Sequence, residues 1–184
     1  MKTGIVPSDW KEALVTPVFK KGEHYNAANY RPISLTSISC EILEHVLVGT
    51  IMDHLETKNS LYPQQHGFRK YRSREPQLLE FIDEFSAPME SGKPTDIIIT
   101  DFAKAFHRVN HSLLVHKLNL YGFRENTKRW IVSFLHDRKQ AVVVGGAKSD
   151  YTYVKTAVPQ GSVLGPCLFL LYINDLALRV SSSS

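Results

Sequence analysis

A short apolar run that ends in an acidic residue constrains this chain more than any other segment. Residues 96–111 read DIIITDFAKAFHRVNH, and the three consecutive isoleucines Ile97–Ile99 predict a buried strand. Asp101 closes the run, where the strand would leave the core, and a helix is expected to follow. A carboxylate at a strand end is held in place yet reaches solvent, which suits a metal ligand. A residue that merely caps a turn fits the same position, so both interpretations of Asp101 stay open at this point.

The bulk composition favours an ordinary folded domain. The chain has 184 residues, of which 43% are hydrophobic, so it has enough apolar material for a core. Its net charge of +4 is a mild bias toward polyanionic partners. We expect an intracellular protein with no membrane segment, because the sequence shows neither a signal peptide nor a long apolar run. Cys40 and Cys167 lie far apart in apolar surroundings, which predicts buried free thiols.

The first half of the chain predicts two strands and two helices. β-branched residues favour a strand over Trp10–Phe19, with Pro17 restricting it to an edge or bulge. Pro32 favours an extended backbone over Asn29–Thr36. Apolar residues at helical spacing then predict a first helix with a buried stripe, made of Ile38, Ile42, Leu43, Val46, Leu47, Ile51 and Leu55. A second helix is predicted to have Pro76 in its first turn, to break near Pro88, and to contain Leu78, Leu79, Ile82 and Phe85.

The second half predicts three more helices and a hairpin. A helix with Leu113, Leu114, Leu118 and Tyr121 is expected to end at Gly122, and another contains Trp130, Ile131, Phe134 and Leu135. Two β-rich runs, Gln140–Val144 and Tyr151–Val158, flank Gly145 and Gly146 and predict a hairpin. A final helix is expected to open at Pro159–Ser162 and to contain Leu168–Leu176. Because strands and helices do not alternate regularly, the order favours an α+β fold over a doubly wound sheet.

Two local patterns offer chemistry of their own. Residues 61–73 include the segment QHGFRKYR, in which Arg69, Lys70 and Arg72 lie among aromatic residues; this suits contacts with a nucleic-acid backbone, and a solvated basic loop fits equally well. His107, His111 and His116 invite a zinc hypothesis, but no Cys or Glu completes a ligand set nearby. No Gly-x-Ser-x-Gly elbow indicates a serine nucleophile.

Five motifs taken in order resemble the reverse transcriptase family, specifically its LINE-type non-LTR retrotransposon branch. They cover nearly the whole chain and read WKEALVTPVFKKG from Trp10, NYRPISLT from Asn29, QHGFR from Gln65, DFAKAF from Asp101, and PQGSVLGP from Pro159 followed by INDL from Ile173. Each motif alone is a weak signal, and their shared order and spacing make the resemblance specific. It implies a right-hand polymerase fold, with fingers and an incomplete palm.

The resemblance also assigns roles to residues. It implies nucleotide addition to a DNA primer on an RNA template, from dNTPs, by phosphoryl transfer with two Mg²⁺ ions. Asp101 would be a metal carboxylate, with the backbone carbonyl of Phe102 beside the same metal. Phe106 would lie beneath the incoming sugar and favour deoxynucleotides. Arg69 would contact the triphosphate, Lys70 and Arg72 would contact nucleic acid or phosphate, and Gln160 and Gly161 would flank nucleotide and template, whereas Asp175 is interpreted as structural.

The sequence departs from the family pattern at several points. The family's second acidic element, a Tyr/Phe-x-Asp-Asp turn, is expected after Leu176, yet no Asp-Asp pair occurs in the 184 residues. His107 stands where the family commonly has Asp, Glu41 where Lys is common, and Arg74-Glu75-Pro76 replaces a more usual Cys-Glu-Thr. We therefore expect a chain truncated before the Tyr-x-Asp-Asp motif.

Three hypotheses follow for function. The chain is a fragment of an RNA-directed DNA polymerase that is inactive alone, a nucleic-acid-binding module without catalysis, or a non-functional retroelement remnant. We expect about 1–95 to form mainly fingers, about 96–180 mainly palm with interleaved fingers segments, and 181–184 a disordered tail. The oligomeric state is left open.

Overall fold

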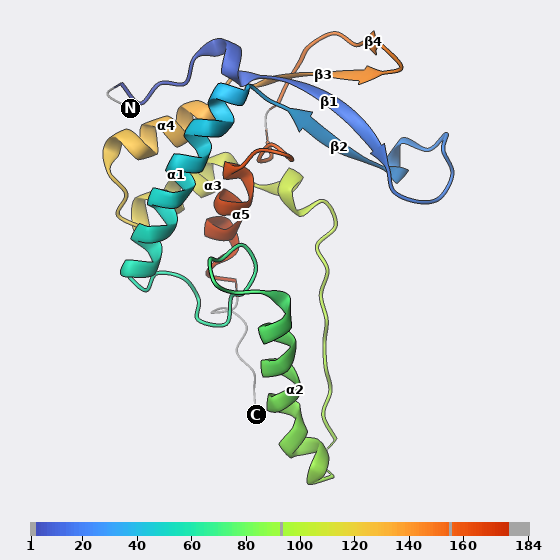
Figure 1. The fold of residues 1–184 in the computed structure, drawn as a ribbon, viewed down its shortest axis with the longest axis vertical. Coiled ribbons are helices and arrows are strands. Elements are labelled where there is room, and N and C mark those ends of the chain that lie inside the picture. Colours follow the sequence, from blue (N-terminus) through green and yellow to red (C-terminus); the bar gives the residue numbers. More distant parts are fainter. Residues whose placement is uncertain (1–2, 93, 155, 177–184) are drawn as a thin grey trace.

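The computed structural model describes residues 3–92, 94–154 and 156–176, and the expected tail 181–184 lies outside this part of the chain. A sheet lies at one end of the molecule, a group of helices packs beneath it, and one helix projects from the opposite end (Figure 1). The mixture of one sheet and five α-helices over the described residues agrees with the predicted α+β class.

The sheet joins strands from both halves of the chain. Its strand order is β2-β1-β3-β4, with β5 pairing on β3. β1 runs antiparallel to β2 and parallel to β3, so the sheet is mixed. The strands are β1 Glu12–Phe19, β2 Tyr30–Leu35, β3 Lys139–Val144, β4 Ala147–Lys148 and β5 Thr152–Tyr153. The edge position predicted for this strand is wrong, because β1 lies between β2 and β3. Pro17 is tolerated there because it pairs with Pro32 beyond the end of the β1–β3 ladder and so has a strand neighbour on one side only.

Four of the helices build the core. Large apolar side chains from α1, α3, α4 and α5 are fully buried against one another, including Trp130, Phe134, Leu55 and Leu168. The helices are α1 Ile38–Thr57, α2 Arg74–Glu90, α3 His111–Leu120, α4 Glu125–Leu135 and α5 Leu164–Ile173. Short 3₁₀ turns are η1 Ser8–Lys11, η2 Ala27–Asn29 and η3 Ala105–Arg108. Gly122 follows the C-cap of α3 with φ +68°, as predicted.

The predicted strand at the isoleucine run is wrong. Residues 94–104 are irregular, and Ile98 and Ile99 are 88% and 87% exposed. In Figure 1 this segment runs extended alongside α2, away from the sheet. An apolar run becomes a strand only where neighbouring strands satisfy its backbone groups, and the sheet of the described residues lies elsewhere.

Other element boundaries also need correction. Ile38, Ile42 and Val46 of the predicted α1 stripe are exposed, and the buried face lies along Cys40, Glu44 and the apolar residues that follow. The second helix continues through Pro88 to Glu90 instead of breaking there. The strand that follows Gly145-Gly146 in the hairpin is the short β4. Of the second predicted run, Tyr151–Val158, only β5 is a strand among the described residues. The last helix begins at Leu164, after the predicted opening at residues 159–162, and ends at Ile173, before the predicted Leu176.

The two cysteines are buried free thiols, as predicted. Over the described residues, no helix combines the length and the apolar character needed to cross a bilayer.

Candidate active site

Asp101 lies on an exposed irregular segment at the mouth of a pocket of about 740 Å³. Phe102 lines the same pocket, and α5 contributes Phe169 and Tyr172 to its wall. The structure therefore places Asp101 and Phe102 together in a concave site. It holds them on a loop, whereas the sequence predicted a rigid strand end.

Two cations, Lys117 and Arg108, line this pocket together with its carboxylates. Lys117, in the last turn of α3, donates a hydrogen bond to the Asp175 carboxylate and another to the Tyr172 carbonyl. Asp175 lines the pocket with Asp101, and its ion pair with Lys117 fits the structural role expected of it. Arg108 adds a second cation. No local pattern in the sequence marked Lys117, because its partners lie 55 and 58 residues away along the chain.

The oxygen donors at this site match the preference of Mg²⁺ in kind but not in number. The exposed Asp101 carboxylate and nearby backbone carbonyls are hard oxygen ligands, which Mg²⁺ takes. Among the described residues, however, no group of three or more acidic, histidine or cysteine side chains is placed to hold a metal ion. His111, one of the histidines considered for zinc, has its Nε2 atom 2.7 Å from the Ala157 carbonyl oxygen. The described residues thus form no complete metal site of their own, and the metal role predicted for Asp101 stays a prediction.

Phe106 connects two predicted motifs through its ring. It stacks on Phe169 of α5 at a centroid distance of 4.7 Å, and Phe68 meets it edge-on at 6.1 Å. These contacts place the QHGFR loop against η3, next to the segment that carries Asp101. Such ring pairs prefer offset or edge-on geometry, so the Phe106 ring is held in one orientation.

Arg69 is engaged by protein groups rather than left free. Its Nε and Nη2 atoms donate to the two carboxylate oxygens of Glu56 at 2.9 and 2.6 Å, and Nη1 donates to the Tyr62 carbonyl at 3.1 Å. The side chain is only 9% exposed. The hydrogen bond from Arg69 lowers the pKa of the Glu56 carboxyl below its ordinary value. A triphosphate would have to compete with Glu56 for this guanidinium, so the contact predicted for Arg69 stays a prediction.

The neighbouring cations of the loop differ in exposure. Lys70 is exposed, and its ammonium lies 5.1 Å from the centre of the Tyr71 ring, which is itself 92% exposed. Arg72 is half-buried and contributes to lowering the pKa of Glu56. An exposed aromatic ring beside cations is a surface suited to unstacked bases and phosphates.

Gln160 and Gly161 are fixed against strand β2. The Ser34 amide donates to the Gln160 carbonyl at 2.9 Å. Gly161 has φ +109°, and a Cβ atom there would lie 2.9 Å from the Ser34 carbonyl oxygen. Glycine is required here because both the backbone angle and the close approach exclude a side chain. Gln160 lines a second pocket, distinct from the one that contains Asp101.

A buried carboxylate, which the sequence reasoning missed, holds the next element in place. Glu44 of α1 is fully buried, and its Oε2 atom accepts a hydrogen bond of 2.9 Å from the amide of Leu164, the first residue of α5. An acidic residue at the N-terminus of a helix satisfies an amide that would otherwise lack a partner. The sequence does contain a signal for it, because Glu44 falls at the helical spacing of the apolar residues Cys40, Leu47 and Ile51 and so shares their face of α1.

The mixed sheet built on the Pro32 strand, the QHGFR loop packed on Phe106, and the PQG loop (Pro159–Gly161) fixed to β2 bring the motifs that resemble reverse transcriptases together in one domain. The sequence pattern of the family described as "Reverse transcriptase (RNA-dependent DNA polymerase)" matches residues 18–183, so the chain belongs to the reverse transcriptase family.

Its relatives are proteins of mobile elements, as the resemblance to non-LTR retrotransposons predicted. The chain is 28% identical to the Pol polyprotein of the type-1 retrotransposable element R2 from Popillia japonica, over 98% of this chain and 25% of the relative. It is 29% identical to the RNA-directed DNA polymerase of the mobile element jockey from Drosophila melanogaster, over 96% of this chain and 19% of the relative. The chain thus spans a quarter or less of these relatives.

Proposed function

We propose that this chain forms part of an RNA-directed DNA polymerase, which adds dNTPs to a DNA primer on an RNA template. The observation that carries the proposal is the position of Asp101: a carboxylate on an open pocket, next to the Phe106–Phe169 stack and within a family match of 18–183. In this assignment Asp101 and the Phe102 carbonyl hold Mg²⁺. The metal supplies neutralisation of phosphate charge during the transfer.

The remaining roles follow the same site. Phe106, oriented by its two ring contacts, selects against a ribose 2′-hydroxyl. Lys70 and Arg72 contact nucleic acid, Gln160 and Gly161 border nucleotide and template, and Arg69 reaches phosphate once released from Glu56. The pairing of β3 with β1 supports the proposal that residues about 96–180 contain interleaved fingers segments alongside an incomplete palm, while about 1–95 form mainly fingers.

We further propose that residues 1–184 alone are inactive, because the described residues bring no second unpaired carboxylate to Asp101: Asp175 is engaged by Lys117. With Mg²⁺, primer–template and dNTPs, we expect no extension above that of the Asp101→Asn variant. In a longer parent polypeptide that contains these residues, we expect extension that Asp101→Asn abolishes. Extension by residues 1–184 that depends on Asp101 would contradict the first expectation, and extension by the parent unaffected by the substitution would contradict the assigned role.

A second function, nucleic-acid binding without catalysis, is favoured by the exposed Lys70 and Tyr71 and the net charge of +4. It predicts that residues 1–184 bind single-stranded RNA with an affinity that falls steeply as salt rises. Substituting Lys70→Ala should reduce the salt slope by about one unit. If residues 1–184 do not bind single-stranded RNA at low salt, this second function is refuted. The remaining interpretation is then a non-functional retroelement remnant.

A further inference from the structure

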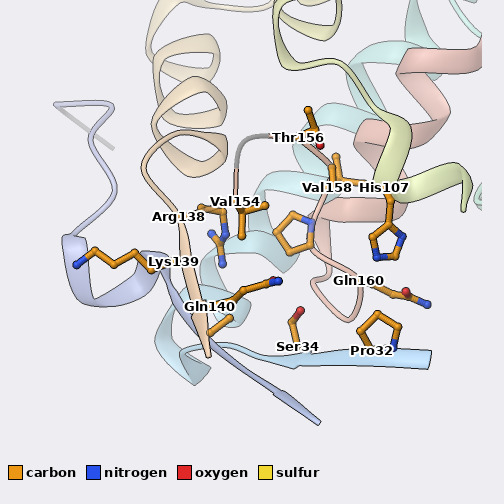
Figure 2. A pocket seen from close by; sticks show the side chains of 13 residues that line it. Pro32, Ser34, His107, Arg138, Lys139, Gln140, Val154, Thr156, Val158 and Gln160 are labelled. Carbon is orange, nitrogen blue, oxygen red and sulfur yellow. The ribbon is translucent and has the colours of Figure 1, made fainter. Parts of the chain in front are cut away.

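A second pocket lies between the sheet and the PQG loop, on residues to which the proposed chemistry gives no role apart from Gln160. It encloses about 280 Å³ and is lined by Ser34 of β2, His107 of η3, Arg138, Gln140 of β3 and Gln160. Figure 2 shows the side chains of Ser34, Arg138 and Gln140 directed toward its interior. The volume lies near the lower end of the range of about 300–1,000 Å³ for small-ligand sites, which suits a single small group.

Arg138 gives this pocket its charge. The residue is 3% exposed, and its Nη1 atom donates to the Phe134 carbonyl at 3.2 Å while the guanidinium carbon lies 4.6 Å from the Phe134 ring centre. Its Nη2 atom is buried and has no hydrogen-bond partner among the described residues. Leaving a charged donor buried and unsatisfied is unfavourable, so this atom calls for an acceptor.

The nearest buried acid does not fill that need. Glu44 interacts electrostatically with Arg138, yet its two carboxylate oxygens accept from the Leu164 amide at 2.9 Å and the Cys40 thiol at 3.3 Å. Burial lowers the pKa of Arg138 below its ordinary value, against the opposing effect of Cys40 and Glu44, so desolvation of the cation is only partly offset.

The rest of the lining favours an anion. None of the residues that line the pocket is acidic, and amide and hydroxyl groups of Gln140, Gln160, Ser34 and Thr156 provide hydrogen-bond donors. The second cation of the lining, Lys139, points away in Figure 2, and its Nζ atom lies 3.6 Å from Glu12. Among the described residues, Arg138 is thus the permanent cation that faces this space. A guanidinium with neighbouring neutral donors is the arrangement that recognises phosphate oxygens.

We propose that this pocket binds one phosphate group, with Arg138 as its charged donor and Gln140 and Ser34 as neutral donors. The group arrives either as free inorganic phosphate or as a phosphodiester of a nucleic-acid strand. The proposal requires neither Asp101 nor a metal ion, so it stands or falls separately from polymerase activity.

The test measures binding by residues 1–184 without Mg²⁺, primer or dNTPs. Inorganic phosphate is titrated by ³¹P NMR line broadening and thermal shift, with sulfate-free chloride buffer of equal ionic strength as reference. A short single-stranded RNA is titrated separately by fluorescence anisotropy. The variants are Arg138→Met, which removes the cation, and Gln140→Glu, which adds a carboxylate at an exposed position and so spares the fold. Gln77→Glu, on the exposed surface of α2, makes the same change in charge away from the pocket.

We expect Gln140→Glu to weaken phosphate or RNA binding at least about tenfold, because the added carboxylate repels an oxyanion across the pocket. Gln77→Glu should leave phosphate binding unchanged. A loss confined to RNA identifies the phosphodiester as the source, and a loss confined to phosphate identifies the free ion. Equal affinities in Gln140→Glu and Gln77→Glu, or absence of binding to both probes, would overturn the proposal even if Arg138→Met fails to fold.

Discussion

Gly161 is the position where a single methyl group tests the placement of the PQG loop. In the structure its φ is +109°, and a Cβ atom would lie 2.9 Å from the carbonyl oxygen and 3.4 Å from the amide nitrogen of Ser34. Both of these atoms belong to the backbone of β2, so no side-chain rotation relieves the clash. Gly161→Ala must therefore either move the loop or distort the strand.

The expected cost has two parts. An L-residue held at this backbone angle carries about 1–3 kcal/mol of strain. Displacing the loop also weakens the hydrogen bond of 2.9 Å from Ser34 to Gln160, which contributes about 0.5–1.5 kcal/mol. We expect Gly161→Ala to lower the free energy of unfolding by about 1.5–4.5 kcal/mol, the sum of these terms.

Gly49 provides the matched control. It lies on the exposed face of α1, and a Cβ atom there would meet nothing within 4 Å. Gly49→Ala should raise stability by about 0.5–1 kcal/mol, because alanine loses less backbone entropy in a helix. Urea unfolding followed by circular dichroism measures both, with equal m-values confirming that the midpoints report stability. If Gly161→Ala fell within about 0.5 kcal/mol of the unsubstituted chain, the loop would not lie on β2 as described.

Burial raises the pKa of both the Cys40 and the Cys167 thiol to about 12, so neither should react with a thiol reagent at pH 8 until denaturant is added; rapid labelling of the folded chain would contradict this. The Glu56–Arg69 pair is partly exposed and should contribute about 1 kcal/mol. Because the pKa of Glu56 is lowered in the folded state, this contribution is present above the ordinary value of 4.5 and is lost as the pH falls below it. The stability difference between the unsubstituted chain and Glu56→Gln should shrink in acid, and a difference that grows would refute the sign. Ile98→Lys should change stability by less than about 0.5 kcal/mol, because the side chain is 88% exposed; a large loss in thermal unfolding would place it in a core.

Elements with a complete local signal were predictable from the sequence. The apolar spacing around Trp130 and Phe134 specified α4, and Pro32 specified the extended backbone of β2. Gly122 marked the end of α3 because only a residue tolerant of positive φ fits there. In each case the residues that fix the element lie within the element or next to it.

Where the outcome depends on distant partners, the sequence was a poor guide. The run Ile97–Ile99 carries strand propensity, but strand formation needs a neighbour, and β1 pairs with β2 and β3 instead. In α1 the same spacing rule chose the wrong face for Ile42, because the buried side is set by the packing of α5 against Glu44. Propensity is a prior that tertiary contacts override.

The candidate site shows the same division between local and distant determinants. The PQG loop is joined to β2 by the Ser34–Gln160 hydrogen bond and to α1 through Glu44 and Leu164, which lie 120 residues apart in the chain. Two separate elements thus hold Gln160 and the phosphate-sized pocket in one geometry. Asp101, by contrast, lies on an exposed irregular segment. Fixing a carboxylate on such a segment costs conformational entropy when it acts, whereas the PQG loop and the pocket beside Gln160 are already preorganised. With the metal role proposed for Asp101, rigidifying residues 94–104 should therefore strengthen Mg²⁺ binding measured by calorimetry, whereas rigidifying the PQG loop should not.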